Sequence, residues 1–226
     1  MNKGRYVFTG MTLFIAWSGW MLALLAVCSE AEWARVIGWI FLGAKGVMLL
    51  STLLGVLCYP VLGMRIFLGR YRFDCRRSHA VIQALVRFSW ELPQTWLGYV
   101  LAQWRNIVGK VDRVDCLGGV TFVTNEHQPG HSYIGMSVGC FANMWIPSAV
   151  KGDFEDFVRH RSYRIYMHEY GHSIDSHRWG LFYLPVVGVT SLASQVLDLK
   201  GWFGHKHSHC FVERLADYHA GRYFDK

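Results

Sequence analysis

The residues from His168 to His172 read His-Glu-Tyr-Gly-His, a pattern that can bind a metal ion and activate water. On a helix, residues four apart lie on one face, so His168 and His172 can present two imidazoles to a single Zn²⁺. Glu169 lies about 100° around the same turn, where it can reach a metal-bound water without binding the metal. Gly171 has no side chain and lets another element approach the ligands. The alternative is a helix with two hydrogen-bonded surface histidines.

A catalytic zinc ion needs a third protein ligand and an open fourth position for water. Glu213 can supply that ligand from a second helix near the C-terminus. Asp217 follows one turn later on the same face and can accept a hydrogen bond from the outer nitrogen of a ligating histidine. Cys140 and Cys210 have no helical or Cys-x-x-Cys pairing with the histidines and are left out. The two segments together predict a site for one zinc ion.

The pattern His-Glu-x-x-His followed by Glu-x-x-x-Asp resembles the gluzincin metallopeptidases, in which two histidines and a distal glutamate hold zinc. In layout the chain is similar to the integral-membrane family that includes the CAAX prenyl protease and the bacterial heat-shock membrane protease. The resemblance rests on the segments from His168 to His177 and from Glu213 to Ala220. It implies a zincin-like domain with His168, His172 and Glu213 as zinc ligands, Glu169 as general base and Asp217 bonded to a ligand.

A site of this kind can hydrolyse peptide bonds. Bound zinc lowers the pKa of its water toward ~7, and Glu169 accepts the proton while the hydroxide attacks the peptide carbonyl. Glu169 then returns the proton to the leaving amine. The oxyanion of the tetrahedral intermediate needs a further hydrogen-bond donor. The candidates are His205, His207, His209 and Tyr218, although loop histidines are usually solvated.

The composition indicates a membrane protein. Of the 226 residues, 52% are hydrophobic and only 17% are charged, which is too apolar for an ordinary soluble domain of this size. The formal net charge is +7, but the basic residues form no stripe interleaved with aromatic residues, which argues against nucleic-acid binding. The six cysteines form no Cys-x-x-Cys pair, which favours free thiols in a reducing compartment.

Residues 1–64 are predicted to form two transmembrane helices joined as a hairpin. The run from Val7 to Cys28 has no charged residue and matches the ~20 residues that cross a bilayer. A cleaved signal peptide is the alternative, but the run is long and no small-residue cleavage site follows it cleanly. The second run, from Val36 to Met64, is interrupted only by Lys45. Lys45 either snorkels to an interface, which we prefer, or makes a polar contact inside the protein.

Basic residues precede the first run and follow the second, which predicts that both termini and the catalytic domain face the cytoplasm at a plasma or inner membrane. Residues 65–109 are predicted to be a basic, aromatic linker with a helix at the membrane interface. The segment from Ala80 to Val108 is amphipathic and carries several tryptophans, and it is interrupted by charges and Pro93. Aromatic residues favour the headgroup zone, so this helix should lie on the bilayer rather than cross it.

Residues 110–226 are predicted to form the catalytic domain. Val120 to Val123 and Ser132 to Ile146 fit two strands joined by a loop. The second strand either adds an extended substrate to its edge or simply packs in the core. Asp153 is expected to cap a helix that runs to about His177 and ends near Gly180.

The segment from Leu181 to Leu197 is uncharged but contains Pro185, so it could be a buried hairpin, a re-entrant segment or a third span. Ser208 can cap a last helix from His209 to Tyr223. The expected fold class is therefore a mainly α membrane protein, with an N-terminal transmembrane helical hairpin and a small zincin-like α+β metalloprotease domain.

The sequence thus predicts a membrane-anchored zinc metalloprotease that acts on protein or peptide substrates in or near the lipid bilayer. One alternative is a non-hydrolytic membrane adaptor or regulator in which zinc only stabilises the fold. A second is proteolysis inside the membrane. That alternative would bury Arg159, Arg161 and Arg164 at a cost of several kcal/mol, so a site at the membrane surface is preferred.

Overall fold

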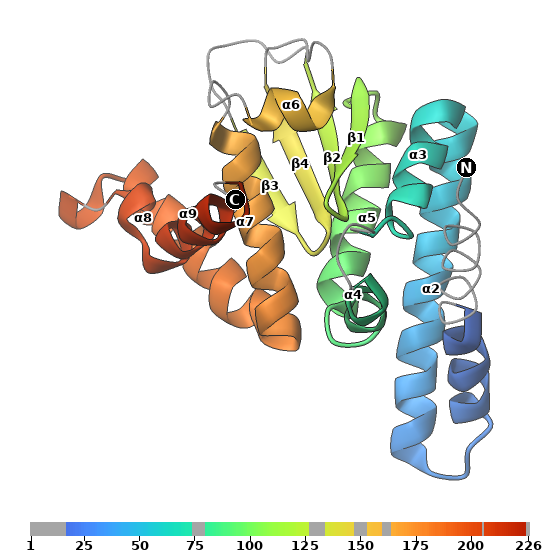
Figure 1. The fold of residues 1–226 in the computed structure, drawn as a ribbon. Coiled ribbons are helices and arrows are strands. Elements are labelled where there is room, and N and C mark those ends of the chain that lie inside the picture. Colours follow the sequence, from blue (N-terminus) through green and yellow to red (C-terminus); the bar gives the residue numbers. More distant parts are fainter. Residues whose placement is uncertain are drawn as a thin grey trace.

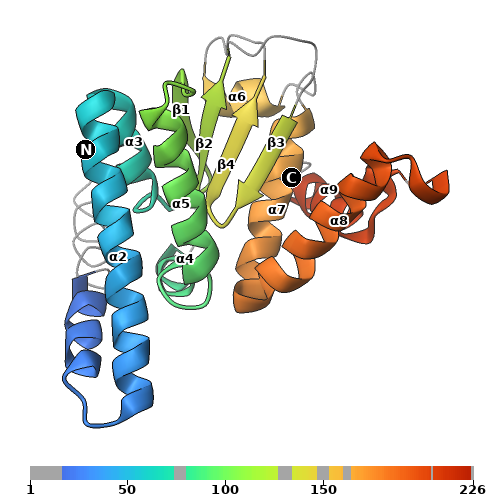
Figure 2. The ribbon, with the colours of Figure 1, turned by 180° about the vertical axis from the view of Figure 1, so that it is seen from behind.

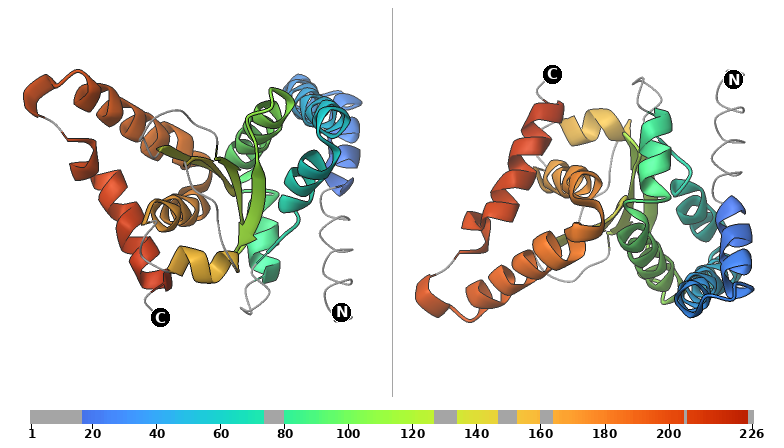
Figure 3. Two further views of the ribbon diagram at one scale, coloured as in Figure 1. Left: turned by 90° about the horizontal axis from the view of Figure 1, so that it is seen from above. Right: turned by 90° about the horizontal axis from the view of Figure 1, so that it is seen from below.

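The computed structural model describes residues 17–73, 80–126, 134–146, 153–159, 164–204 and 206–224. A four-stranded sheet lies between two groups of helices (Figure 1). Helices α2, α3 and α5 lie on one side of the sheet, and α6, α7 and α9 lie on the other (Figure 2). Seen from above and below, the N-terminal helices and α8 occupy opposite ends of the molecule (Figure 3). The described chain is mostly helical around this small sheet.

The sheet has the order β1-β2-β4-β3. Its strands are β1 (Arg113–Leu117), β2 (Val120–Asn125), β3 (Ile134–Val138) and β4 (Phe141–Trp145). β1 with β2 and β3 with β4 form antiparallel pairs, whereas β2 and β4 run parallel. The prediction of two strands is therefore wrong. β1 was not expected, and the stretch from Ser132 to Ile146 contains two strands, because Gly139 at φ +64 turns the chain between β3 and β4.

The core lies on both faces of β2. Phe122 packs with Phe154 and Tyr166 on the side of α6 and α7. Val123 packs with Tyr99 and Phe141 on the side of α5. Helices cover both faces, so five of the six residues of β2 are buried, including Thr121 and Thr124.

The N-terminal hairpin consists of the helix Trp17–Val27 and α2 (Glu32–Cys58). The two helices touch at Gly38, where an added Cβ would lie 2.7 Å from the backbone nitrogen of Val27. α2 is long and apolar enough to cross a membrane. The predicted second span is two helices, because Pro60 has no N–H to continue α2 and instead begins α3 (Pro60–Gly69). Residues 7–16 of the first predicted span lie outside the described residues.

Lys45 contacts the interior of this half of the molecule. Its Nζ lies 5.2 Å from the ring centroid of Trp20, across the hairpin. Its ammonium also lies 3.2 Å from the position that a Cβ on Gly19 would take. The structure thus favours a polar contact inside the protein over the snorkelling that we preferred.

The segment predicted as one interfacial helix forms α4 (Ala80–Arg87) and α5 (Leu92–Ile107). The prediction is wrong for α5, which is a core layer of the fold. Arg105 is only 4% exposed and donates to the carbonyl oxygens of Val123 (3.1 Å) and Met144 (3.0 Å) in the sheet. This charged residue of the amphipathic segment therefore bonds to the backbone of the sheet, inside the protein.

The helix expected from Asp153 to His177 is two helices with different directions, α6 (Phe154–Arg159) and α7 (Arg164–Trp179) (Figure 1). Asp153 does cap α6, since its Oδ1 accepts hydrogen bonds from the backbone nitrogens of Glu155 (2.9 Å) and Asp156 (3.3 Å). Phe154 of α6 and Tyr166 of α7 both pack against Phe122 of β2.

The uncharged segment after α7 is helical throughout and is not a hairpin. Gly180, at φ +51, ends α7 as expected. The chain continues as a 3-10 turn η2 (Gly180–Phe182), a π-helix η3 (Tyr183–Gly188) and α8 (Val189–Leu199). With α7, these elements form one helical stretch, Arg164–Leu199, which is the second described stretch that is long and apolar enough to cross a membrane.

The last helix, α9 (Phe211–Phe224), starts later than predicted. The 3-10 turns η4 (Trp202–Gly204) and η5 (His207–His209) precede it. Ser208 lies inside η5, so it does not cap α9. Phe211 and Tyr218 of α9 are more than half exposed, whereas Val212, Ala216 and Ala220 are buried.

Candidate metal centre

Helices α7 and α9 cross closely enough to place their polar side chains together. At the crossing, a Cβ on Gly171 would lie 2.0 Å from the carbonyl oxygen of Ala216. Only glycine fits at this position, because the obstructing atoms belong to the backbone of α9. The prediction that Gly171 admits another element near the histidines is confirmed, and that element is the helix that carries Glu213.

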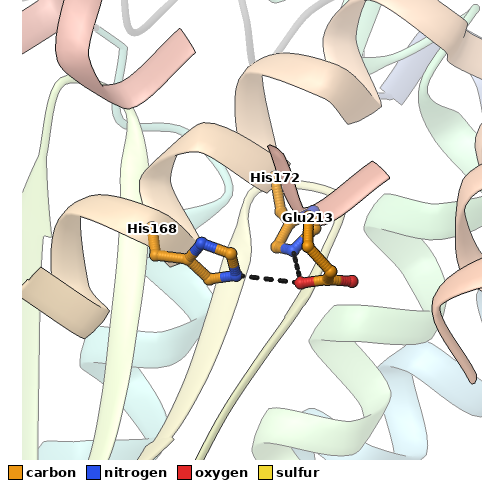
Figure 4. A group of neighbouring side chains, drawn as sticks. All are labelled: His168, His172 and Glu213. Carbon is orange, nitrogen blue, oxygen red and sulfur yellow. Dashed lines mark hydrogen bonds and ion pairs between the residues drawn. The ribbon is translucent and has the colours of Figure 1, made fainter. Parts of the chain in front are cut away.

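Three side chains converge at this crossing (Figure 4). Glu213 Oε2 lies 3.1 Å from His168 Nε2 and 3.2 Å from His172 Nε2. Ligands bound at about 2.1 Å to a tetrahedral zinc ion lie roughly 3.4 Å apart, so these separations are close to those of a coordinated set. His168, His172 and Glu213 could therefore bind a metal ion.

His168 and Glu213 also form hydrogen bonds through the side-chain atoms that face away from the metal position. His168 Nδ1 lies 2.9 Å from Asp217 Oδ1, which directs Nε2 toward Glu213. Glu213 Oε1 accepts a hydrogen bond from Ser191 Oγ at 2.6 Å. These contacts fix the rotamers of His168 and Glu213 without using the atoms that face the metal position.

The carboxylates of α9 are held in the charged form. Burial alone would raise the pKa of Glu213, but its hydrogen bonds with His168 and His172 bring the pKa far below its usual range. The hydrogen bond with His168 also lowers the pKa of Asp217. Both groups are therefore anionic at neutral pH, as a metal ligand and the partner of a ligand must be.

Glu169 lies beside this group and is 4% exposed. Its side chain lies against β3, where a Cβ on Gly135 would come within 2.2 Å of Oε1. Ser137 Oγ of the same strand donates to the backbone oxygen of Glu169 at 2.9 Å. Within the described residues Glu169 Oε2 has no hydrogen-bond partner. A buried carboxylate oxygen without a protein partner is a suitable acceptor for a water molecule at the metal position.

A buried polar network behind His172 was not predicted from the sequence. Arg178 Nη1 donates to His219 Nε2 at 2.7 Å, so His219 carries its proton on Nδ1 and donates to Asp175 Oδ1 at 2.5 Å. Asp175 is fully buried, and its other oxygen lies 4.0 Å from His172 Nδ1. The network thus places a carboxylate behind the second histidine. The spacing of Asp175, three residues after His172 on the same helix, was a signal that could have identified it.

The structure describes three of the four candidate oxyanion donors, and they differ in their distance from the site. His207 Nε2 lies 3.5 Å from Glu213 Oε1. The other ring nitrogen of His207, Nδ1, lies 3.0 Å from Ser194 Oγ. His209 is exposed, and Tyr218 is 56% exposed with its hydroxyl bonded to Arg222. Of the described candidates only His207 reaches the site, while His205 lies outside the described residues.

The chain was compared with protein families, curated proteins and solved structures. No protein family model, curated protein or solved structure matches the chain. The resemblance to gluzincins therefore rests on the two motifs and stays a prediction, to be judged by the chemistry of the site.

Proposed function

We propose that this protein is a membrane-anchored, zinc-dependent metalloprotease. One observation carries the proposal: His168, His172 and Glu213 converge through single ligand atoms beside the buried carboxylate of Glu169. Two imidazoles and one carboxylate are a donor set that suits zinc, and three protein ligands leave room for water and substrate. A zinc ion that only stabilises the fold is usually enclosed by four protein ligands.

The residues of the chain have distinct roles in this proposal. A bound zinc ion would supply Lewis acidity, which polarises a peptide carbonyl and acidifies water. Glu169 accepts a proton from the attacking water through Oε2, to which no described residue is hydrogen-bonded, and returns it to the leaving amine. His207, held by Ser194, is the candidate donor to the oxyanion.

The edge of the sheet supports a peptide as the substrate. β3 is the edge strand beside α7, and its Gly135 and Ser137 contact Glu169. An extended peptide that pairs with the outer edge of β3, beside which no described strand lies, would run past Glu169 and the metal position. The backbone pairing would fix the peptide carbonyl without requiring one particular side chain.

We place the reaction at the membrane surface. The N-terminal hairpin supplies the anchor, since α2 is long and apolar enough to cross a bilayer. Arg164 at the start of α7 and Asp217 beside His168 are exposed charged side chains, and both would be costly in hydrocarbon. In this arrangement the catalytic domain faces the cytoplasm, and its substrates are proteins or peptides in or near the membrane.

The test is the substitution Glu169→Gln in the full chain, purified in detergent and given a proteome-derived peptide library. We expect it to keep one zinc ion per chain and to lose peptide cleavage by at least about a hundredfold, because Gln cannot accept the proton. Cleavage is read by mass spectrometry, and zinc by elemental analysis. Glu30→Gln, at an exposed position between the hairpin helices, is the matched control and should cleave normally.

If Glu169→Gln retained full cleavage, the proposal would be refuted. If the unmodified protein bound zinc and cleaved nothing, while His172→Ala lost both zinc and folded structure, the adaptor with a structural zinc would replace it. Zinc analysis and cleavage are measured on the same samples, so the two functions give different results.

A further inference from the structure

The outer edge of β3 is accessible over only part of its length. β3 is the edge strand beside α7 (Figure 1). Ile134 and Met136 are 42% and 40% exposed, whereas Ser137 and Val138 are buried. A peptide that pairs with this edge can therefore reach the first residues of the strand but not the last ones.

The backbone groups of Gly135 and Ser137 point away from the sheet. Val138 and Phe141 are partners across the turn between β3 and β4, and the residues that flank such a tight turn bond to each other. Successive residues of a strand bond to opposite sides, so Met136 also bonds to β4. Gly135 and Ser137 consequently present their N–H and C=O groups at the outer edge.

The outward carbonyl oxygen of Ser137 is already bonded within the protein. It accepts a hydrogen bond from the hydroxyl of Tyr183 at 3.0 Å. Tyr183 begins the π-helix η3 and is only 3% exposed, in a buried apolar cluster. The turn before it is held by Gln94, whose Nε2 donates to the carbonyl oxygen of Gly180 at 2.7 Å. The tyrosine ring is therefore a fixed obstacle at this end of the edge.

An antiparallel peptide would fit the accessible part of the edge. Antiparallel pairing is slightly more stable per residue than parallel pairing, and the peptide residue opposite Gly135 would exchange two hydrogen bonds with it. Its neighbours would lie opposite Met136 on the N-terminal side and opposite Ile134 on the C-terminal side. Their side chains would contact these two exposed apolar residues, on one face of the strand. Glu169 lies on the other face, against Gly135.

We propose that Tyr183 is a specificity-determining residue, which ends the paired part of a bound peptide at the residue opposite Met136. This inference rests on the proposed protease function and deepens it. The next residue toward the peptide N-terminus would need the carbonyl oxygen of Ser137, and Tyr183 occupies that position. Because Glu169 lies against Gly135, the site binds few residues on the N-terminal side of the cleaved bond. The preferred substrates carry apolar residues on both sides of the residue opposite Gly135.

The test uses the zinc-loaded full chain in detergent and phosphinic peptides, in which a phosphinic acid group replaces the cleaved amide and fixes the register at the metal. The peptides are lengthened by one residue at a time toward either end, and isothermal titration calorimetry gives each dissociation constant. On the N-terminal side we expect the affinity to stop rising at one position, where the next residue adds less than about twofold. In Tyr183→Leu that residue should add about tenfold, because its backbone can then bond to Ser137.

Tyr183→Phe is the matched control. It retains the ring, so the affinity should stop rising at the same position as in the unmodified chain. Leucine keeps an apolar side chain in the buried cluster but is too short to reach Ser137. A second measurement needs no variant and decides the question if Tyr183→Leu folds poorly. In the unmodified chain, N-methylation of the peptide residue opposite Gly135 should weaken binding about tenfold, and N-methylation of the residue beyond the stop should not.

A continued rise of affinity on the N-terminal side in the unmodified chain would overturn the role of Tyr183, and so would an unchanged stop in folded Tyr183→Leu. Either result would leave the protease proposal intact, because cleavage of unmodified peptides is measured on the same samples. A zinc-loaded chain that neither bound the phosphinic peptides nor cleaved any peptide would instead refute the protease proposal, and this inference with it.

Discussion

The contact between Gly171 and Ala216 allows a prediction that links the packing of two helices to metal binding. In Gly171→Ala the new methyl group would lie 2.0 Å from the carbonyl oxygen of Ala216, whereas ordinary contact begins at 3.4 Å. The backbone of α9 must therefore move away by about 1.4 Å. Metal sites tolerate ligand displacements of only about 0.2 Å, so this shift withdraws Glu213 from the two histidines.

The same substitution should also change stability. Overpacking of a close contact costs about 1–3 kcal/mol, and the higher helix propensity of alanine returns at most about 1 kcal/mol. We expect a lower melting temperature and at least a tenfold weaker zinc affinity, measured by thermal denaturation and by competition with a chromophoric chelator.

Gly46→Ala provides the matched control for this change. Gly46 lies on α2, and an added Cβ meets no atom within 4 Å. Only the higher helix propensity of alanine acts at this position. The melting temperature should therefore stay equal or rise, and the zinc affinity should not change. A Gly171→Ala protein with the zinc affinity of the unmodified chain would refute the claim that this close approach sets the ligand geometry.

Three further predictions concern the charged groups. Asp217→Asn removes the anionic partner of His168 and should weaken zinc binding about 10- to 100-fold with little change in melting temperature; an unchanged affinity would show that the 2.9 Å contact does not orient the ligand. Asp175→Asn leaves His219 without its anionic acceptor and should lower the free energy of unfolding by about 1–3 kcal/mol. Urea denaturation measures this change, and an unchanged free energy of unfolding would show that the network is solvated. The pKa of Glu213 lies below its usual range in the folded chain, so its stabilising contribution is complete above about pH 5 and declines as the pH falls toward the folded-state pKa. Melting of the metal-free protein between about pH 7 and 3 should show this loss, and Glu213→Gln should reduce it.

The parts of the site that were predictable are those that depend on local spacing. His168 and His172 lie one helical turn apart in any helix, and so do Glu213 and Asp217. The sequence therefore indicated two helix faces that could meet. Gly171 indicated the point on the first helix where the second could approach. The π-helix η3 and the network of Asp175 and His219 were missed, because they depend on which elements pack together.

The errors in the fold have a common physical origin. Polar and aromatic residues in α5 resembled those of an interfacial helix, yet Arg105 bonds to carbonyl oxygens of β2 and β4. A buried cation that bonds to strand backbone cannot be distinguished from a solvated one by its position along the chain. The pairing of β2 with β4 likewise joins strands that are not adjacent in the sequence.

The N-terminal hairpin and the candidate metal centre are parts of one packed unit, and this bears on the substrate of the proposed protease. Gln103 and Asn106 of α5 donate to the backbone oxygens of Gly63 (3.0 Å) and Gly55 (2.9 Å), so the hairpin is bonded to the helix that supports the sheet. The opposite face of that sheet packs against α7, which carries His168 and His172. A flexible tether would let the proposed active site sample any protein nearby, whereas this arrangement, in the proposed membrane orientation, would hold it at a fixed height above the bilayer. The proposed protease would therefore select substrates by the distance of the cleaved bond from the bilayer.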